Sequence, residues 1–459
     1  MFPSFTLADA EAVALTNNKD ILAMRQLVEK VKQGRLESIS KWLPEVNLIS
    51  RGYKTERVQE DTGTRSSFIS QLSLTQALFS PDRYYQVKIS NFEVMQLNAL
   101  FDALIIDVLY DIRTAYYAIL LDYENIAVAK RTVDLFSSLA KRMEANYDIG
   151  YSILLNVNQS KVAIANATSV YYQSAKQLEV DLDRLATLLG YNSGSIKLQF
   201  AEHGIPIFSI PDIAEKVVRV EEIFAKQKKE GEIYQPSFPE REERLMKNLY
   251  SQYEIEDWEK KALLYRPDLQ ARCAEWKIAA EQVKKQKGEY LPSVRLEANY
   301  GGYPTRMLDN PSSGFFNQHF NWAVGFCLHW LVYDGCGRTY RINQAKHERQ
   351  AKCLEYSKGI QSLYEEIRKQ IFTIEESVAN YVTAEGNVKL AEQTLTLADK
   401  QLDIGYITVF DYQIVVNALI QAINIRNRAR FDLIRGYYGL RHASGVDLMA
   451  CPNKFKNCH

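Results

Sequence analysis

The chain has no long apolar run, no net charge and little glycine or proline. Its most apolar stretch, residues 322–333, is about a dozen residues long, whereas a membrane-spanning helix needs roughly 20. The 56 lysines and arginines equal the 56 aspartates and glutamates in number, so no surplus of cations is available for nucleic-acid binding. With only 21 glycines and 12 prolines among 459 residues, the composition favours long regular elements over a loop-rich fold.

The common motifs of enzymes and metal sites are also missing. The six histidines form no HExxH motif, no GxxxxGK[ST] loop occurs, and the Gly-Cys-Gly at 335–337 lacks the remainder of a dinucleotide-binding loop. No pair of the six cysteines has CxxC spacing. Cys451 and Cys458 either form a disulfide in an oxidising compartment or remain free thiols. The sequence therefore predicts no enzymatic activity, no cofactor and no metal.

The first residues, MFPSFTLADA, lack the basic start and apolar stretch of a signal peptide. We therefore expect either a cytoplasmic protein or a processed form of an exported one.

An internal repeat organises the chain. The segment LPEVNLISRGY at 43–53 recurs as LPSVRLEANYGGY at 291–303, and the DIGY at 148–151 recurs at 403–406. The first pair is 248 residues apart and the second pair 255, so both belong to one long repeat. We predict two copies of one unit at residues 1–192 and 257–444, a linker at 193–256 and a C-terminal tail at 445–459.

Each copy follows the same order of predicted elements. An opening helix (residues 7–41 and 256–290) ends before a Leu-Pro pair, and two strand-like runs follow. Next comes a very long helix (83–149 and 338–404), whose apolar residues recur every three or four positions, and then a return helix (154–189 and 410–442). This spacing predicts a mainly α-helical fold with a small β part, in which each long helix packs against two half-length helices as a coiled-coil-like hairpin.

The strand-like runs are amphipathic, most clearly the last one, at 320–330. Its apolar side chains alternate with small or polar ones. The apolar set, predicted to face lipid, is Phe320, Trp322, Val324, Phe326, Leu328 and Trp330. Four strands cannot close a barrel, and open edges in lipid leave backbone groups unpaired. Three chains together would supply twelve strands, enough to enclose an aqueous bore, so we predict a trimeric twelve-stranded β-barrel in a membrane.

The duplicated order of helix, strand pair, long helix, glycine turn and return helix resembles the TolC family of outer-membrane efflux proteins. The resemblance rests on the segment from KALLYRPDLQ to LEANYG at 261–301, on FCLHWLVYDGCGRTYRINQA at 326–345 and on the two glycine turns. It implies a homotrimeric channel in the outer-membrane lipid, continued by a periplasmic helical domain. It further implies a periplasmic adaptor (membrane fusion) protein and an inner-membrane transporter of the resistance-nodulation-division or ABC type. The expected role is the exit duct for efflux or type I secretion.

The resemblance also suggests site residues at the two glycine turns. Adaptor contacts are expected at Asp148, Gly150, Tyr151, Asp403 and Gly405, although each glycine is also explained by a left-handed turn alone.

Six residues beyond each glycine, the family narrows the aperture with polar groups, here Asn156 and Asp411. Three copies of Asp411 would form an acidic ring, although this residue is equally explained as an exposed helix carboxylate. Ile407 and Ile414 replace the charged residues of the family's gating lock. Closure is therefore expected to depend on apolar contacts among Tyr406, Ile407 and Phe410.

One alternative belongs to a different class of protein. A soluble coiled-coil scaffold would use the same helical periodicity, with its strands packed as small accessory sheets. It leaves the aromatic-ended apolar run at 320–330 without a function.

Overall fold

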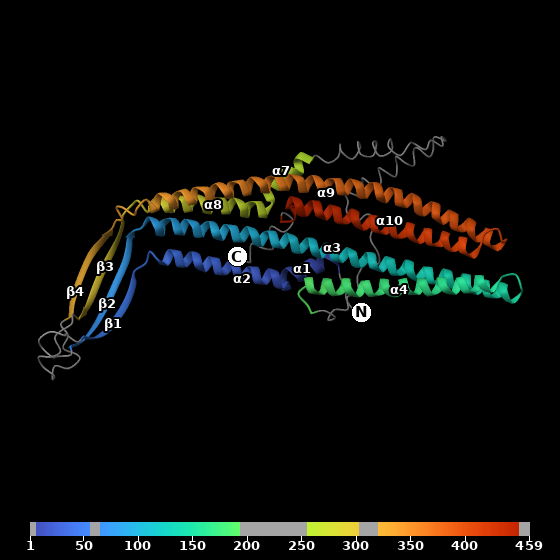
Figure 1. The fold of residues 1–459 in the computed structure, drawn as a ribbon, viewed down its shortest axis with the longest axis horizontal. Helices are drawn as coiled ribbons and strands as arrows, with labels where there is room; N and C mark the ends of the chain where they lie inside the picture. Colours follow the sequence, from blue (N-terminus) through green and yellow to red (C-terminus); the bar gives the residue numbers. More distant parts are fainter. Residues whose placement is uncertain (1–5, 56–64, 193–254, 303–319, 449–459) are drawn as a thin grey trace. The chain divides into compact units, whose positions relative to one another are not determined.

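The computed structural model describes residues 6–55, 65–192, 255–302 and 320–448. The predicted linker therefore lies almost wholly outside the described residues, as do Cys451 and Cys458. The elements in chain order (Figure 1) are α1 (Leu7–Asn17), α2 (Lys19–Ser40), β1 (Glu45–Thr55), β2 (Arg65–Phe79), α3 (Pro81–Asp148), α4 (Leu154–Leu188), α7 (Ile255–Tyr265), α8 (Pro267–Gly288), β3 (Ser293–Gly302), β4 (Phe320–His329), α9 (Gly337–Asp403), α10 (Val409–Ser444) and the 3₁₀ turn η1 (Val446–Leu448). The mainly helical fold with four strands is confirmed.

The predicted opening helices are each interrupted, which is the main difference from the sequence prediction. Asn18 separates α1 from α2 because its side chain caps the second helix, with Oδ1 accepting from the backbone N–H of Asp20 (2.9 Å) and Ile21 (3.1 Å). Its Nδ2 also donates to the carbonyl of Leu188 at 2.8 Å. The break is therefore held by a contact 170 residues away in the sequence, which apolar periodicity does not reveal.

The second break lies between α7 and α8, at Arg266. Pro267 is the first residue of α8, a position that tolerates a missing N–H, and proline disfavours helical backbone at the residue before it. The side chain of Arg266 binds Glu366 in α9, with Nη1 2.5 Å from Oε2. The Arg-Pro pair at 266–267 is therefore the local sequence signal for this break.

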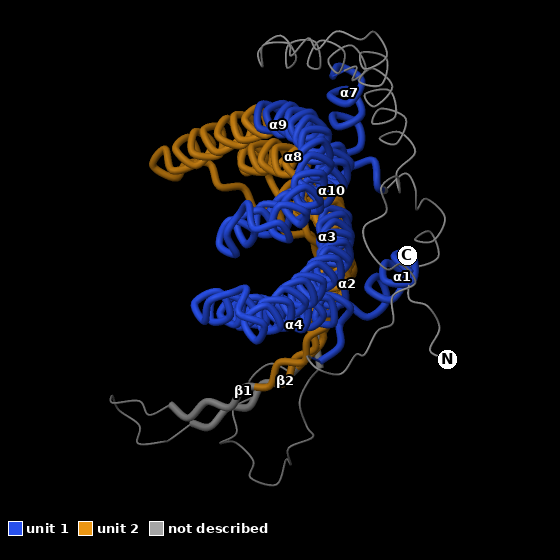
Figure 2. The backbone as a smooth tube through the Cα atoms, turned by 90° about the vertical axis from the view of Figure 1, so that its right-hand side faces the viewer, with its two compact units in different colours: residues 1–24, 102–267, 360–459 blue, residues 25–101, 268–359 orange. Residues whose placement is uncertain are grey.

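The described chain divides into two compact units, shown in different colours in Figure 2. Unit 1 comprises residues 1–24, 102–267 and 360–459, and unit 2 comprises residues 25–101 and 268–359. Each unit draws on both halves of the sequence, and the long helices α3 and α9 contribute to both.

Unit 2 contains the sheet, a four-stranded antiparallel meander in the order β1-β2-β3-β4 (Figure 1). The central pairing of β2 with β3 joins the two halves of the sequence, for example Leu72 with Tyr300. A β-bulge interrupts this pairing near Ala77, at the end of β2 that leads into α3. Side-chain contacts then fix the helices of this unit, including the Ser38–Ser90 hydroxyl pair (2.8 Å) between α2 and α3.

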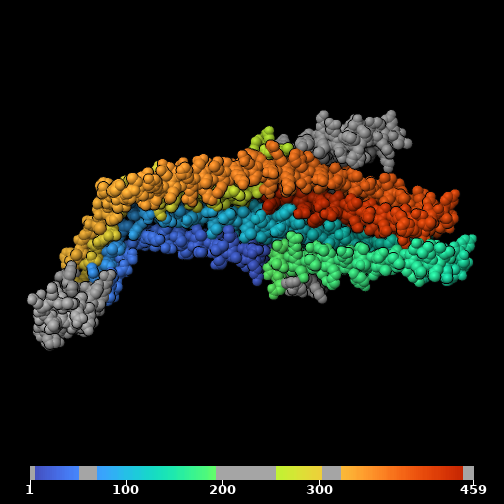
Figure 3. Space-filling model, in the orientation of Figure 1, coloured from blue at the N-terminus to red at the C-terminus, as the bar shows by residue number. Residues whose placement is uncertain are grey.

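Unit 1 is an all-helical bundle. Its apolar cores contain residues of α3, α4, α9 and α10, and Figure 3 shows α4 and α10 next to each other on one face. At one end, Asp447 of η1 is fully buried between Arg113 of α3 (Nη1–Oδ2, 2.6 Å) and Arg441 of α10 (Nη2–Oδ1, 2.8 Å). Residues 446–448, assigned to the C-terminal tail by the sequence prediction, are therefore a packed part of this bundle.

Within the described ranges, no helix combines the length and apolarity needed to cross a bilayer. The four cysteines in these ranges, Cys273, Cys327, Cys336 and Cys353, are free thiols.

Candidate functional site

The two glycine turns share one backbone geometry, which explains why the DIGY sequence recurs. Gly150 and Gly405 have φ values of +79° and +75°, in the left-handed region that favours glycine. At the first turn, the N–H of Gly150 donates to the backbone carbonyl of Tyr147 (2.9 Å), and the N–H of Tyr151 donates to the backbone carbonyl of Asn146 (2.7 Å). This pattern closes the helix end in the manner of a Schellman motif, and the second turn repeats it.

The residues beside these glycines expose large apolar side chains. Tyr151 is 89% exposed and Tyr406 83%, while Ile149 and Ile404 are each 71% exposed. Exposed aromatic and aliphatic groups on a well-defined turn are suited to contact another protein surface. The structure therefore places the predicted adaptor-contact residues at the two helical turns of unit 1, beside these exposed apolar side chains.

Asp411 lies in the first turn of α10, where it forms a capping box with Thr408. The backbone N–H of Thr408 donates to the carboxylate of Asp411 (3.1 Å), and the backbone N–H of Asp411 donates to the hydroxyl of Thr408 (3.1 Å). The Thr408 hydroxyl in turn donates to Oδ2 of Asp411 (2.7 Å). These bonds, chiefly the one from the Thr408 side chain, lower the pKa of Asp411. The carboxylate therefore has a local role in starting α10 and remains exposed.

The other predicted aperture residues are divided between the surface and the core. Asn156 donates to the hydroxyl of Ser152 (3.1 Å) in the first turn of α4. Ile407 packs against an apolar cluster, whereas Tyr406 and Phe410 remain exposed, Phe410 at 57%. The chain thus presents two of the three predicted closing side chains to its surroundings.

An arginine near the turns was missed by the sequence prediction. Arg142 of α3 reaches α9, where its Nη1 is 2.8 Å from Oδ1 of Asp403 and its Nη2 is 3.4 Å from Oδ1 of Asp399. The guanidinium also lies over the ring of Tyr412 in α10, 5.8 Å from its centroid. Burial, followed by a hydrogen bond with Asp399, raises the pKa of Tyr412 to about 12.

Arg142 thereby links the two helical hairpins beside their turns. The only sequence signal was the spacing of Asp399 and Asp403, which places two carboxylates one helical turn apart on one face. It did not identify a partner 257 residues away.

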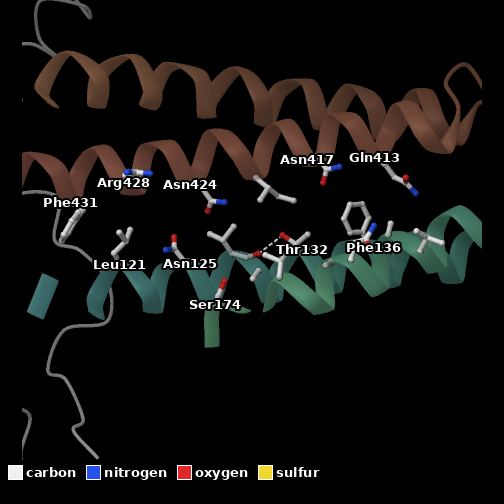
Figure 4. Close-up of a pocket in the computed structure, with 18 of the residues that line it drawn as sticks. Leu121, Asn125, Thr132, Phe136, Ser174, Gln413, Asn417, Asn424, Arg428 and Phe431 are labelled. Carbon is white, nitrogen blue, oxygen red and sulfur yellow. Dashed lines mark hydrogen bonds between the residues drawn. The ribbon is translucent and has the colours of Figure 1, made fainter. Parts of the chain in front are cut away.

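A groove of about 680 Å³ runs between α4 and α10, with α3 as its floor. Figure 4 shows Gln413, Asn417 and Asn424 of α10 directed toward α3 and α4 across it. The facing wall includes Asn125 of α3 and Ser174 of α4. Its lining mixes amide, hydroxyl and charged groups with apolar side chains such as Leu121, Val128 and Phe136, so the groove is amphipathic.

The predicted lipid-facing residues lie in unit 2, on β4. Side chains from paired positions share one face, so Trp322 lies beside Tyr300, Val324 beside Ala298 and Phe326 beside Leu296. The exposed fractions of Trp322, Val324, Phe326 and Leu328 range from 62% to 76%. Phe320 begins the strand, and its side chain lies outside the described residues. Trp330 lies one residue beyond β4 and donates from Nε1 to the carbonyl of Tyr290 (3.0 Å).

The strand register extends the apolar face of β4 across the other three strands of the sheet. On this face, Tyr300 of β3 pairs with Leu72 of β2 and Ala298 pairs with Leu74, whereas Leu296 pairs with Gln76. Leu72 and Leu74 pair in turn with Leu48 and Val46 of β1. The opposite face carries mainly polar or small residues: Glu45, Asn47, Ser73, Thr75, Arg295, Glu297, Asn299, Ala323, Gly325 and Cys327. One face of the sheet is therefore mainly apolar, while the other carries mainly polar or small side chains.

Comparison with known proteins agrees with this architecture. The outer membrane efflux protein family matches residues 12–191 and 258–446. The chain is 23% identical over 169 residues to the outer membrane protein TolC of Vibrio cholerae, covering 37% of this chain and 38% of TolC. It is 22% identical over 190 residues to the alkaline protease secretion protein AprF of Pseudomonas aeruginosa, covering 41% of this chain. The aligned segment spans only 38% of the length of each of these curated relatives.

The fold itself matches over nearly the whole chain. The Campylobacter jejuni CmeC outer membrane channel superposes with a TM-score of 0.72 at 15% identity, covering 96% of this chain and 85% of CmeC. These relatives and fold neighbours are channel and secretion proteins rather than enzymes. Because the family match covers both halves of the sequence, the chain belongs to the outer membrane efflux protein family, and its location is the outer membrane.

Proposed function

We propose that the protein is the exit duct of a tripartite efflux pump or a type I secretion system. Three copies combine their four-stranded sheets into a twelve-stranded barrel, and their helical bundles continue the passage through the periplasm. The duct is passive and has no catalytic activity. Transport is driven by an inner-membrane transporter of the resistance-nodulation-division or ABC type, connected through a periplasmic adaptor.

The observation that carries this proposal is the amphipathic sheet with its exposed apolar face. The outer edges of β1 and β4 have no partner strand among the described residues. In lipid, such edges leave backbone N–H and C=O groups unpaired at a cost of several kcal/mol each, so the edges of neighbouring copies must pair. Family membership supports this assembly over the soluble-scaffold alternative.

The proposal is tested by adding the purified protein to planar lipid bilayers. We expect stepwise conductance from a species that cross-links as a trimer. A monomer that forms no pores and stays in the aqueous phase without detergent would overturn the proposal.

The internal duplication, with one copy at residues 1–192 and the other at 257–444, forms part of the same proposal. It is supported by the recurring element order, since β1, β2, α3 and α4 correspond to β3, β4, α9 and α10. The pairing of β2 with β3 also supports it, because one strand from each proposed copy then forms the centre of the sheet.

We further infer that Asp411 contributes an acidic ring to the periplasmic aperture. Replacing Asp411 by asparagine is expected to raise the concentration of Mg²⁺ that blocks the channel by about fivefold or more, because each copy loses one unit charge. The measurement is single-channel current against Mg²⁺ concentration. Asparagine retains an oxygen that can accept from Thr408, so α10 should still form, and Asp134→Asn on α3 is the matched control.

The pH dependence of this block follows from the capping box. Because hydrogen bonds hold the pKa of Asp411 below its ordinary value of 3.8, the carboxylate remains charged throughout the range of about pH 5 to 8. Block should therefore be constant over that range and be lost only as the pH falls through the lowered pKa. Unchanged block in Asp411→Asn would contradict the acidic ring.

We also infer that Arg142 holds the aperture closed by linking α3 to α9. Exposed ion pairs are worth about 0.2–1 kcal/mol each, so Arg142→Ala should raise the open probability about two- to fivefold. The measurement is the open-time fraction in planar bilayers, with Arg131→Ala, on an exposed part of α3, as the control. An equal rise in both variants would show that Arg142 has no special role in closure.

A further inference from the structure

Although the whole chain has no net charge, its charged residues are divided unevenly between unit 1 and unit 2. The described residues of unit 2 carry 22 lysines and arginines against 13 aspartates and glutamates, a net charge of +9. Those of unit 1 carry 21 against 28, a net charge of −7. The basic unit is the one that contains the amphipathic sheet.

The helices join the strands at a single end of this sheet, and every junction there carries a cation. Because the sheet is an antiparallel meander, the start of β1, the end of β2, the start of β3 and the end of β4 lie at the same end. The register confirms this, since Phe79 pairs with Val294 and Ser293 pairs with His329. The cations at the four junctions, in strand order, are Lys41, then Arg83 with Lys88, then Lys285 with Lys287, then Arg338 with Arg341. Of these, Lys285 is paired with Asp82 at 3.2 Å.

Aromatic side chains accompany these cations. Tyr84 and Tyr290 are 50% and 46% exposed, and Trp330 is 56% exposed. Lys88 Nζ lies 4.6 Å from the centroid of the Tyr84 ring, and the Arg338 guanidinium lies 4.6 Å from that of Tyr290. Aromatic rings and long basic side chains are the residues that occupy the boundary between lipid and water.

The cations at the junctions differ in whether they form ion pairs with nearby carboxylates. Arg341 is compensated by Glu289 (2.7 Å) and Asp334 (3.3 Å). Lys287, by contrast, is exposed at the end of α8 and forms no ion pair with any described residue.

Two further cations are also available to an anion. Arg83 donates to the carbonyl of Lys41 and has no carboxylate partner within the described ranges. Lys41 itself has only an exposed pair with Glu37 at 3.4 Å. The first three junctions therefore retain cationic groups that an anion can approach.

We propose that the strand–helix junctions of unit 2 form a belt that binds the head groups of anionic phospholipids. The belt comprises Lys41, Arg83, Lys88 and Lys287, and its phosphate-binding cations adjoin the apolar face of the sheet, where Phe79 and Leu328 are 47% and 63% exposed. That continuity selects a lipid over a free phosphate, because the acyl chains of the lipid can cover the neighbouring apolar surface. The inference rests on the proposed function, since it requires the sheet to be inserted in a bilayer.

The test measures lipid selectivity through tryptophan fluorescence. The full chain is reconstituted in mixtures of phosphatidylcholine with brominated phosphatidylglycerol, or with brominated phosphatidylcholine, because bromine quenches tryptophans such as Trp42 and Trp330 that lie near the lipid. We expect stronger quenching by the brominated phosphatidylglycerol at low salt. In 1 M NaCl, where the screening length is about 3 Å, the two lipids should quench alike.

Single substitutions test which lysines produce the preference for phosphatidylglycerol. Each of Lys41→Gln and Lys287→Gln should lower the preference for phosphatidylglycerol by up to about fivefold. Lys389→Gln, on an exposed part of α9 in unit 1, should leave it unchanged. Inorganic phosphate at millimolar concentration should not compete, and if it does, the ligand is a free anion instead of a lipid.

The outcomes distinguish this inference from the proposed function. Equal quenching by both lipids at low salt, in a protein that does insert, would overturn the belt alone. A similar loss of preference in Lys389→Gln would also overturn it, because the effect would then follow total charge. Absence of quenching by either lipid would overturn the proposed function.

Discussion

Replacing Phe326 by arginine is expected to abolish stable insertion into the outer membrane. Phe326 is 75% exposed on the apolar face of the sheet, paired with Leu296 near the middle of β4. A charged side chain at mid-depth on the lipid face costs about 2–4 kcal/mol per chain, and a trimer would carry three. The measurement is the fraction of protein recovered as a heat-modifiable trimer in the outer-membrane fraction, which should fall to a small remainder.

The matched control is Ala323→Arg, three residues away on the opposite face of the same strand. Ala323 pairs with Asn299 on the polar face, so the new arginine would face water. We expect Ala323→Arg to assemble normally and to change mainly the conductance. If both variants insert equally well, then the face identified as apolar does not contact lipid.

Replacing Asp447 by asparagine is expected to destabilise unit 1 by about 3–5 kcal/mol. Asp447 has a fully buried side chain that bridges Arg113 and Arg441, and Arg113 also binds Glu11 of α1 at 2.6 Å. The substitution removes the carboxylate that Arg441 binds and leaves Arg113, only 8% exposed, with Glu11 alone. The measurement is the midpoint of chemical unfolding in detergent, followed by circular dichroism at a helix-sensitive wavelength.

The control compares this buried network with an exposed ion pair of the same bundle. Lys161 and Glu144 are 2.8 Å apart, with side chains 58% and 47% exposed. Glu144→Gln should therefore cost no more than about 1 kcal/mol. If Asp447→Asn has an equally small effect, the buried arginines must find other partners or water, and the bridge is not what holds η1 in place.

Much of the architecture was predictable because it depends on local patterns. Alternating apolar residues predicted β4 almost to the residue, and the three-four spacing predicted α3 and α9 to within two residues at each end. The recurring DIGY sequence located both turns, since only glycine adopts their left-handed backbone without strain. The predicted site residues at those turns were named from a family resemblance, and their roles in the aperture and in adaptor binding stay predictions.

Local patterns failed where a distant partner decided the outcome. The side chain of Asn18, besides capping α2, is anchored to α4 through the carbonyl of Leu188, and the link at Arg142 depends on Asp399 and Asp403. A sequence shows that these residues are polar, but it does not show which distant group completes each hydrogen bond or ion pair.

The sequence by itself determined the length, order and amphipathic faces of the elements, because these follow from side-chain periodicity within one segment. Only the tertiary structure decided that β2 pairs with β3, that Asp447 is buried between two arginines, and that the balanced charge is divided into a basic unit and an acidic one. The strand pairing and the Arg113–Asp447 ion pair join residues more than 200 positions apart in the chain. Their energies arise from burial and pairing after the chain has folded, and no single segment contains them.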